Sequence, residues 1–191
     1  MTRAQRLLLD AQLAFWICVG LCFAVTGGGL FSHNHGLSFY GGRWSTIVPW
    51  TVGLAAASFL VLRAAEELVH TDPPLARALR LNVLLVLSIL FTPDTVSQLW
   101  YVLHIVASTA LFLFQAALGL WLVLRSLRAV VLQLYVVQIA GGIVAGLSQV
   151  HLIDLLGIGI VVFQVAFGAL LVCFPIGDAR VVAAREATGT D

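Results

Sequence analysis

The stretch "LWYVLHIVASTALFLFQAALGLWLVL" (residues 99–124) contains no Asp, Glu, Lys or Arg, and only isolated polar residues interrupt its apolar character. An α-helix needs about 20 predominantly apolar residues to cross a hydrocarbon core of about 30 Å. The stretch therefore predicts a membrane-spanning helix. Its few polar side chains, His104 and Gln115 among them, then need a physical explanation.

Composition places the whole chain in the same class. Hydrophobic residues make up 61% of the 191 residues and charged residues only 10%, against roughly half and a quarter in a soluble domain. All ten cations are arginines and nine residues are acidic, so no strongly basic surface is available for nucleic acid. We exclude nucleic acid as a partner and expect an all-α polytopic membrane protein in contact with lipid.

Six apolar runs predict six transmembrane helices. They cover residues 7–28, 46–65, 75–92, 99–124, 129–148 and 155–174. The third run is the shortest, because "LNVLLVLSILF" (residues 81–91) offers few uninterrupted residues before Pro93. We expect it to cross from a start near Asp72-Pro73-Pro74, because the arginines then gather on one side of the membrane.

The arginine distribution predicts the orientation. If all six runs cross, nine arginines lie on one side, which the positive-inside rule assigns to the cytoplasm, and only Arg43 lies outside. The nine are Arg3, Arg6, Arg63, Arg77, Arg80, Arg125, Arg128, Arg180 and Arg185. We therefore expect a plasma-membrane protein with both termini in the cytoplasm, a bundle over residues 1–176 and a short cytoplasmic tail over residues 177–191.

Polar side chains in and near the spans are candidates for ligand binding, because polar groups that face lipid are costly. The candidates are His104, Gln115, Gln138, Gln149, Gln164, Asp154 and Arg43. One glutamine from each of the last three spans falls near mid-membrane depth, and the other residues fall toward the outer face. This pattern predicts a cup that opens outward above an amide-lined floor. Alternatively, the glutamines bond one another between helices, and Asp154 is the N-cap of the last helix.

A metal site is a further possibility at the polar break "FSHNHGLSFYGGRW" (residues 31–44). The candidate metal ligands are His33, His35, His104 and His151. In an extended loop the two loop histidines point to the same side and form a chelate for zinc or copper, with a third imidazole or Asp94 or Asp154 completing it. An HxH pair alone is weak evidence, because loop histidines are more often simply solvated. We rank haem below zinc, because only His104 lies within a span.

Three functions are compatible with these features. The leading hypothesis is binding of a small ligand, lipid headgroup or metal ion in the outward-facing cup, for transport, sensing or lipid handling. A second is a metal-dependent membrane enzyme with an extracytoplasmic histidine site and Asp94 or Asp154 as general base. A third is a structural subunit that packs against other membrane subunits through a face such as Gly142 to Gly146.

The outer segment "GLSFYGGRWSTIVPW" (residues 36–50) leads directly into the second span. With the chain's size and six spans, it resembles small bacterial membrane proteins of the Frag1/DRAM/Sfk1-like group, which are of unknown function. The resemblance is architectural over the whole chain and has one loose motif. It implies the fold and assigns no catalytic residues.

Reporter fusions test the predicted orientation. A fluorescent protein fused after Asp191 should fluoresce, whereas alkaline phosphatase at the same place should be inactive, because its disulfides form only outside the cytoplasm. The phosphatase inserted between residues 150 and 155 should be active. Phosphatase activity at the C-terminal fusion with none at the inserted one would reverse the assigned orientation.

Overall fold

The computed structural model describes residues 1–27, 37–92 and 97–176, and every regular element in these ranges is helical. The elements are α1 (Arg3–Thr26), the 3-10 helix η1 (Leu37–Tyr40), α3 (Ile47–Leu68), α4 (Pro73–Leu90), α5 (Gln98–Ser126), α6 (Ala129–Gln149) and α7 (Leu156–Cys173). Six of them are long and apolar enough to cross a membrane, which confirms the all-α prediction with six candidate spans. The expected tail, residues 177–191, lies outside the described residues.

Local capping explains where the helices begin. α1 starts at Arg3, before the apolar run, because Thr2 and Gln5 form a capping box. α4 starts at Pro73, because the Asp72 carboxylate accepts a hydrogen bond from the main-chain N–H of Leu75 and proline suits the first helical position. The third helix thereby reaches 18 residues in spite of its short uninterrupted apolar run.

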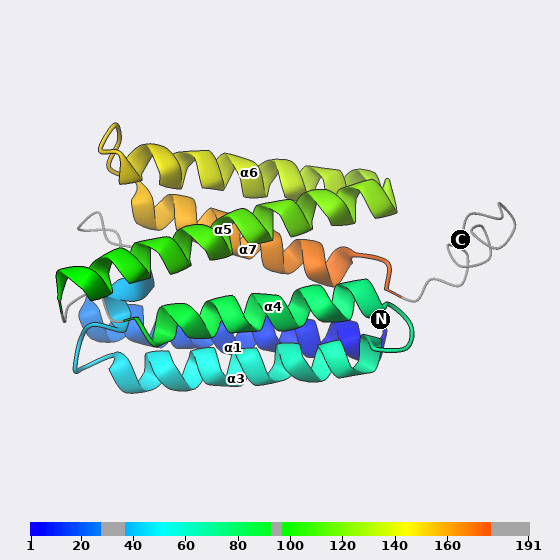
Figure 1. Ribbon diagram of the computed structural model, residues 1–191, viewed down its shortest axis with the longest axis horizontal. Coiled ribbons are helices and arrows are strands. Elements are labelled where there is room, and N and C mark those ends of the chain that lie inside the picture. Colours follow the sequence, from blue (N-terminus) through cyan, green and yellow to red (C-terminus); the bar gives the residue numbers. More distant parts are fainter. Residues whose placement is uncertain (28–36, 93–96, 177–191) are drawn as a thin grey trace, which may run out of the picture.

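The helices form two groups of three, α1, α3 and α4 on one side and α5, α6 and α7 on the other (Figure 1). Within the groups, α1 packs extensively against α3 and α6 against α7. The main contacts between the groups join α1 to α7 and α4 to α5. The outer faces carry apolar side chains such as Phe59 and Leu113, which are 62% and 64% exposed. Such faces suit a lipid environment.

Small residues bring α6 and α7 into backbone contact. A Cβ atom at Gly141 would lie 2.6 Å from the main-chain nitrogen of Phe163 and 2.9 Å from the carbonyl oxygen of Gly159. Gly142 packs against the rings of Phe112 and Phe163 inside the bundle. Of the two glycines that mark the expected subunit-binding face, Gly146 is the open one, with nothing within 4 Å of the place where a Cβ atom would lie.

Two polar contacts tie the chain together at the end of the bundle where α1 starts. The Gln5 amide donates to the carbonyl oxygens of Val172 (3.2 Å) and Phe174 (2.9 Å), so the first turn of α1 caps the end of α7. The Arg125 guanidinium donates to both carboxylate oxygens of Asp72, at 3.0 and 2.9 Å. This ion pair joins the end of α5 to the start of α4.

Alanine substitution tests the close contact between α6 and α7. Gly141→Ala should lower the free energy of unfolding by about 1–3 kcal/mol, because the added methyl group overlaps backbone atoms of α7. Gly146→Ala, on the same helix but facing open space, should be neutral or stabilise by about 0.5–1 kcal/mol. Unfolding in detergent followed by circular dichroism measures both. Equal effects of the two substitutions would contradict the contact.

Candidate functional site

A cavity of about 210 Å³ lies between the two helix groups. Its wall comes from α1, α3, α4, α5 and α7, with Leu37 of η1 beside Trp50. Most lining side chains are apolar, and none of those that the structure describes carries an acid, a base or a thiol. The lining residues with amide or hydroxyl groups are Gln12, Ser58, Asn82, Ser108, Gln115 and Gln164.

Three amide side chains form a hydrogen-bonded relay along this wall. The Gln164 amide nitrogen donates to Gln115 Oε1 at 2.9 Å, and Gln115 Nε2 donates to Asn82 Oδ1 at 3.0 Å. Gln138 adds a bond from α6, since its Nε2 donates to the main-chain oxygen of Gln115 at 3.1 Å. The relay links α4, α5, α6 and α7 near the middle of each helix.

Several polar atoms on the cavity wall have no hydrogen-bond partner among the residues that the structure describes. They are Asn82 Nδ2, Gln164 Oε1, the Gln12 amide and the hydroxyls of Ser58 and Ser108. The relay uses only one end of the Asn82 and Gln164 amides. None of these atoms is among the fully buried, unpartnered atoms of the described residues, so they are open to the cavity. Polar groups in such a position take water or a ligand group as a partner. The cavity is therefore a place where free hydrogen-bonding groups collect.

The relay can run in either direction. Each amide carries both a donor and an acceptor, and the two ends of an amide are interchangeable within the same space. In the structure the relay leaves Asn82 Nδ2 and Gln164 Oε1 unused. If both bonds are reversed, Asn82 Oδ1 and Gln164 Nε2 are unused instead. Either direction leaves one donor and one acceptor on opposite sides of Gln115.

Gln138 belongs to the relay but not to the cavity. Its side chain is fully buried, and its Oε1 has no partner among the described residues. A Cβ atom at Gly119 would lie 2.5 Å from this oxygen, so the glycine makes room for the amide. Gln138 thus holds the main chain of Gln115 from α6 without lining the cavity.

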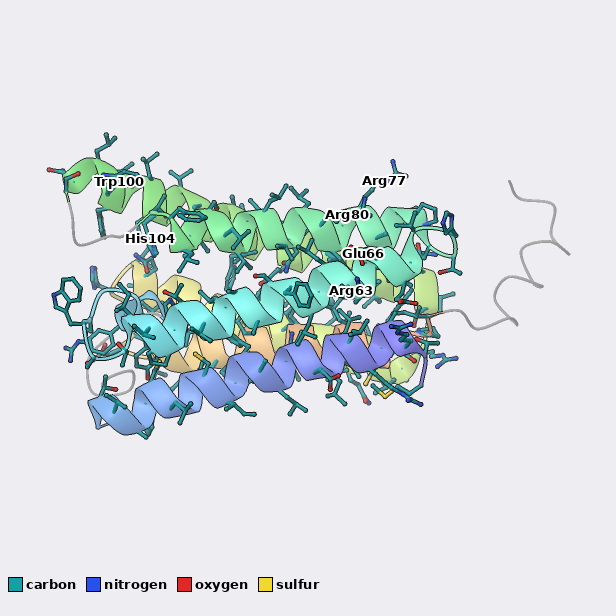
Figure 2. The ribbon with its side chains drawn as sticks, turned by 90° about the horizontal axis from the view of Figure 1, so that it is seen from below. Arg63, Glu66, Arg77, Arg80, Trp100 and His104 are labelled. Carbon is teal, nitrogen blue, oxygen red and sulfur yellow. The ribbon has the colours of Figure 1, made fainter. Side chains whose placement is uncertain are left out.

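The residues predicted at the outer ends lie apart from the cavity. His104 is buried, with its Nδ1 2.7 Å from the carbonyl oxygen of Thr92, and it lies near Trp100 toward the start of α5 (Figure 2). Gln149, His151 and Asp154 are exposed. None of the four lines the cavity. Asp154 is also not the N-cap of α7: that position is Leu155, which makes no side-chain capping bond.

Arg43 lies outside the cavity as well. Its guanidinium carbon is 3.9 Å from the centre of the Phe39 ring, and its side chain is exposed next to Trp44, which is 94% exposed. The arrangement is a cation–π contact at the surface. It leaves the cavity without a cation.

The metal prediction concerns residues that are only partly described. His33, His35 and Asp94 lie outside the described residues. Over residues 1–27, 37–92 and 97–176, no group of three or more His, Cys, Asp or Glu side chains is placed to hold a metal ion. His104 and His151 therefore form no such group within these ranges, and the zinc chelate at the loop stays a prediction.

The sequence analysis missed three lining residues, Gln12, Ser58 and Asn82. Each is a polar residue within a predicted apolar run, as are the glutamines of the last three spans. Asn82 lies inside "LNVLLVLSILF", which the prediction treated as uninterrupted. Applying the criterion to the first three spans would have found all three.

Comparison of the chain with protein-family models, curated protein sequences and solved structures finds no match. The functional argument consequently rests on the geometry of the cavity.

A double-mutant cycle tests the relay. Gln115→Leu and Asn82→Leu should each lower stability, and the two effects should be non-additive by about 0.6–2 kcal/mol, the range for side-chain hydrogen bonds between membrane helices. Gln133→Leu, at an exposed position of α6, is the matched control and should show no coupling to Asn82→Leu. Strictly additive effects of the first pair would mean that the bond contributes nothing.

Proposed function

We propose that this chain is an integral plasma-membrane protein with six crossings and cytoplasmic termini, and that it binds a small uncharged molecule in the cavity between its helix groups. Six apolar helices and the one-sided arginine distribution support the insertion and the orientation. The unpaired amide and hydroxyl groups on an otherwise apolar cavity wall support the binding. That second observation carries the functional proposal.

The ligand carries no charge. An ion in this cavity would find no counter-charge among the described lining residues, and placing an unpaired ion against a mostly apolar wall costs far more than placing a neutral polar group there. This argument weighs against a phosphate-bearing headgroup or a bare metal ion in the cavity. It favours a neutral molecule with an apolar part, which contacts side chains such as Phe112 and Trp50.

The relay indicates which neutral molecules fit best. One donor and one acceptor remain on it in either direction, so a ligand with a hydroxyl or an amide group can pair with whichever of the two it reaches. An ether or a ketone satisfies only the donor. A volume of about 210 Å³ lies below the roughly 300–1,000 Å³ of sites for drug-sized ligands. A compact alcohol or amide is therefore the expected ligand class.

The cavity favours transport over catalysis. General acid–base and nucleophilic mechanisms need a titratable group at the reacting atoms, and the described lining residues supply none. Secondary transporters bind their substrates near the membrane midplane at the interface between helix groups. Gln12, Asn82 and Gln115 lie near the middle of their helices, so the cavity has the corresponding position.

Fluorine NMR in lipid nanodiscs tests the binding. The probes are 4-fluorobenzyl alcohol and 4-fluorobenzamide, with 4-fluorotoluene and 4-fluorobenzoate as apolar and charged comparisons. The alcohol and the amide should give saturable signals with the wild-type protein. Ala57→Phe, which fills the cavity, should abolish them. Ala56→Phe, next along α3 but exposed, should leave them unchanged.

The comparisons separate two ways in which the proposal can fail. If all four probes give only the non-saturable signal of partitioning into lipid, the cavity holds water alone and the binding proposal is wrong. If 4-fluorotoluene binds as tightly as the alcohol, the cavity binds ligands but the relay does not select them. Gln115→Leu should then have no effect on either probe.

A further inference from the structure

Arg77 and Arg80 lie on the outer side of α4. They are one turn apart, so both side chains leave the same face of the helix, and both are exposed (Figure 2). Leu81 and Leu84, the next exposed residues of α4, are apolar and 45% and 64% exposed. Two cations therefore interrupt a face that otherwise suits lipid.

Neither arginine has a carboxylate partner within the described part of the chain. Arg77 makes one long contact, from its Nε to the Pro73 carbonyl oxygen at 3.4 Å. Three other arginines at this end of the bundle do form ion pairs, at distances of 2.9–3.4 Å. These pairs are Arg3 with Glu67, Arg63 with Glu66 and Arg125 with Asp72. The charge of the α4 pair is thus left without compensation by the described acids.

Arg80 lies deep along the helix. It is seven residues beyond Pro73, the first residue of α4, which is about 10 Å along the axis at 1.5 Å per residue. A cation at this depth on a lipid-facing surface extends toward the headgroup layer, because hydrocarbon offers it no hydrogen-bond acceptor. The acceptor within reach there is a lipid phosphate.

We propose that Arg77 and Arg80 bind the phosphate of an anionic phospholipid in the cytoplasmic leaflet. The guanidinium fork donates two parallel hydrogen bonds to a phosphate, and two such groups one turn apart surround it from the side of the helix. Two unpaired positive charges favour a lipid with a net negative charge over a zwitterionic one, whose own cation they repel. The site rests on the proposed membrane insertion but is separate from the cavity.

Native mass spectrometry of the delipidated full-length protein in detergent tests this site. Phosphatidylglycerol is added in parallel with phosphatidylcholine, and the bound lipid is counted. The wild-type protein should retain phosphatidylglycerol preferentially. Arg77→Gln/Arg80→Gln should weaken its binding by roughly 10- to 30-fold, the effect expected from two surface cations. Arg3→Gln/Arg6→Gln removes the same charge at the same end and should have little effect.

Four controls make the outcome decisive. Unchanged circular dichroism and melting of Arg77→Gln/Arg80→Gln exclude misfolding as the cause of the loss. Equal losses in the two double variants would mean that general attraction to the basic end binds the lipid, and the assigned site would be wrong. If soluble glycerol phosphate displaces the lipid at similar affinity, the ligand of this site is a free phosphate ester and the lipid assignment is wrong. Ala57→Phe should bind phosphatidylglycerol normally, so failure here and failure of the cavity proposal are distinguishable.

Discussion

An amide buried between apolar helices must find its hydrogen bonds on another helix, and this requirement organises the centre of the bundle. Gln115 meets it by bonding to Asn82 and Gln164 through its side chain and to Gln138 through its main-chain oxygen. Four helices are fixed in register by these bonds. The same requirement bears on the cavity, because Asn82 and Gln164 each use one end of the amide in the relay and both residues line the cavity.

The sequence predicted the fold well because its determinants are local. The length of an apolar run and the residues that flank it are visible without knowledge of the neighbouring helices, so all six helices were found. The differences at the ends have local causes too. α1 begins four residues before the predicted start, at Arg3, because the capping box of Thr2 and Gln5 extends the helix beyond the apolar run.

The site was predicted only in part, because periodicity gives the depth of a residue but not the helix that it faces. Gln115 and Gln164 lie near the middle of their helices, yet the bond from Gln115 to Asn82 depends on how the two helix groups pack. His151 and Asp154 were expected at the outer rim of a cup, and the turn between α6 and α7, where His151 has a φ of 60°, leaves them exposed and away from the cavity. That turn geometry has no signature in the apolar pattern.

The bond from Gln5 to the end of α7 bears on how the chain is made. Ribosomes synthesise the helices in order, so the first turn of α1 meets Val172 and Phe174 only after the other five helices of the bundle have been synthesised. Until then Gln12 and Asn82 line an incomplete cavity, because the helix that carries Gln164 is still missing. The insertion machinery, or lipid itself, must accommodate these amides during biogenesis. Their exposure ends when α7, the last helix, packs against the others.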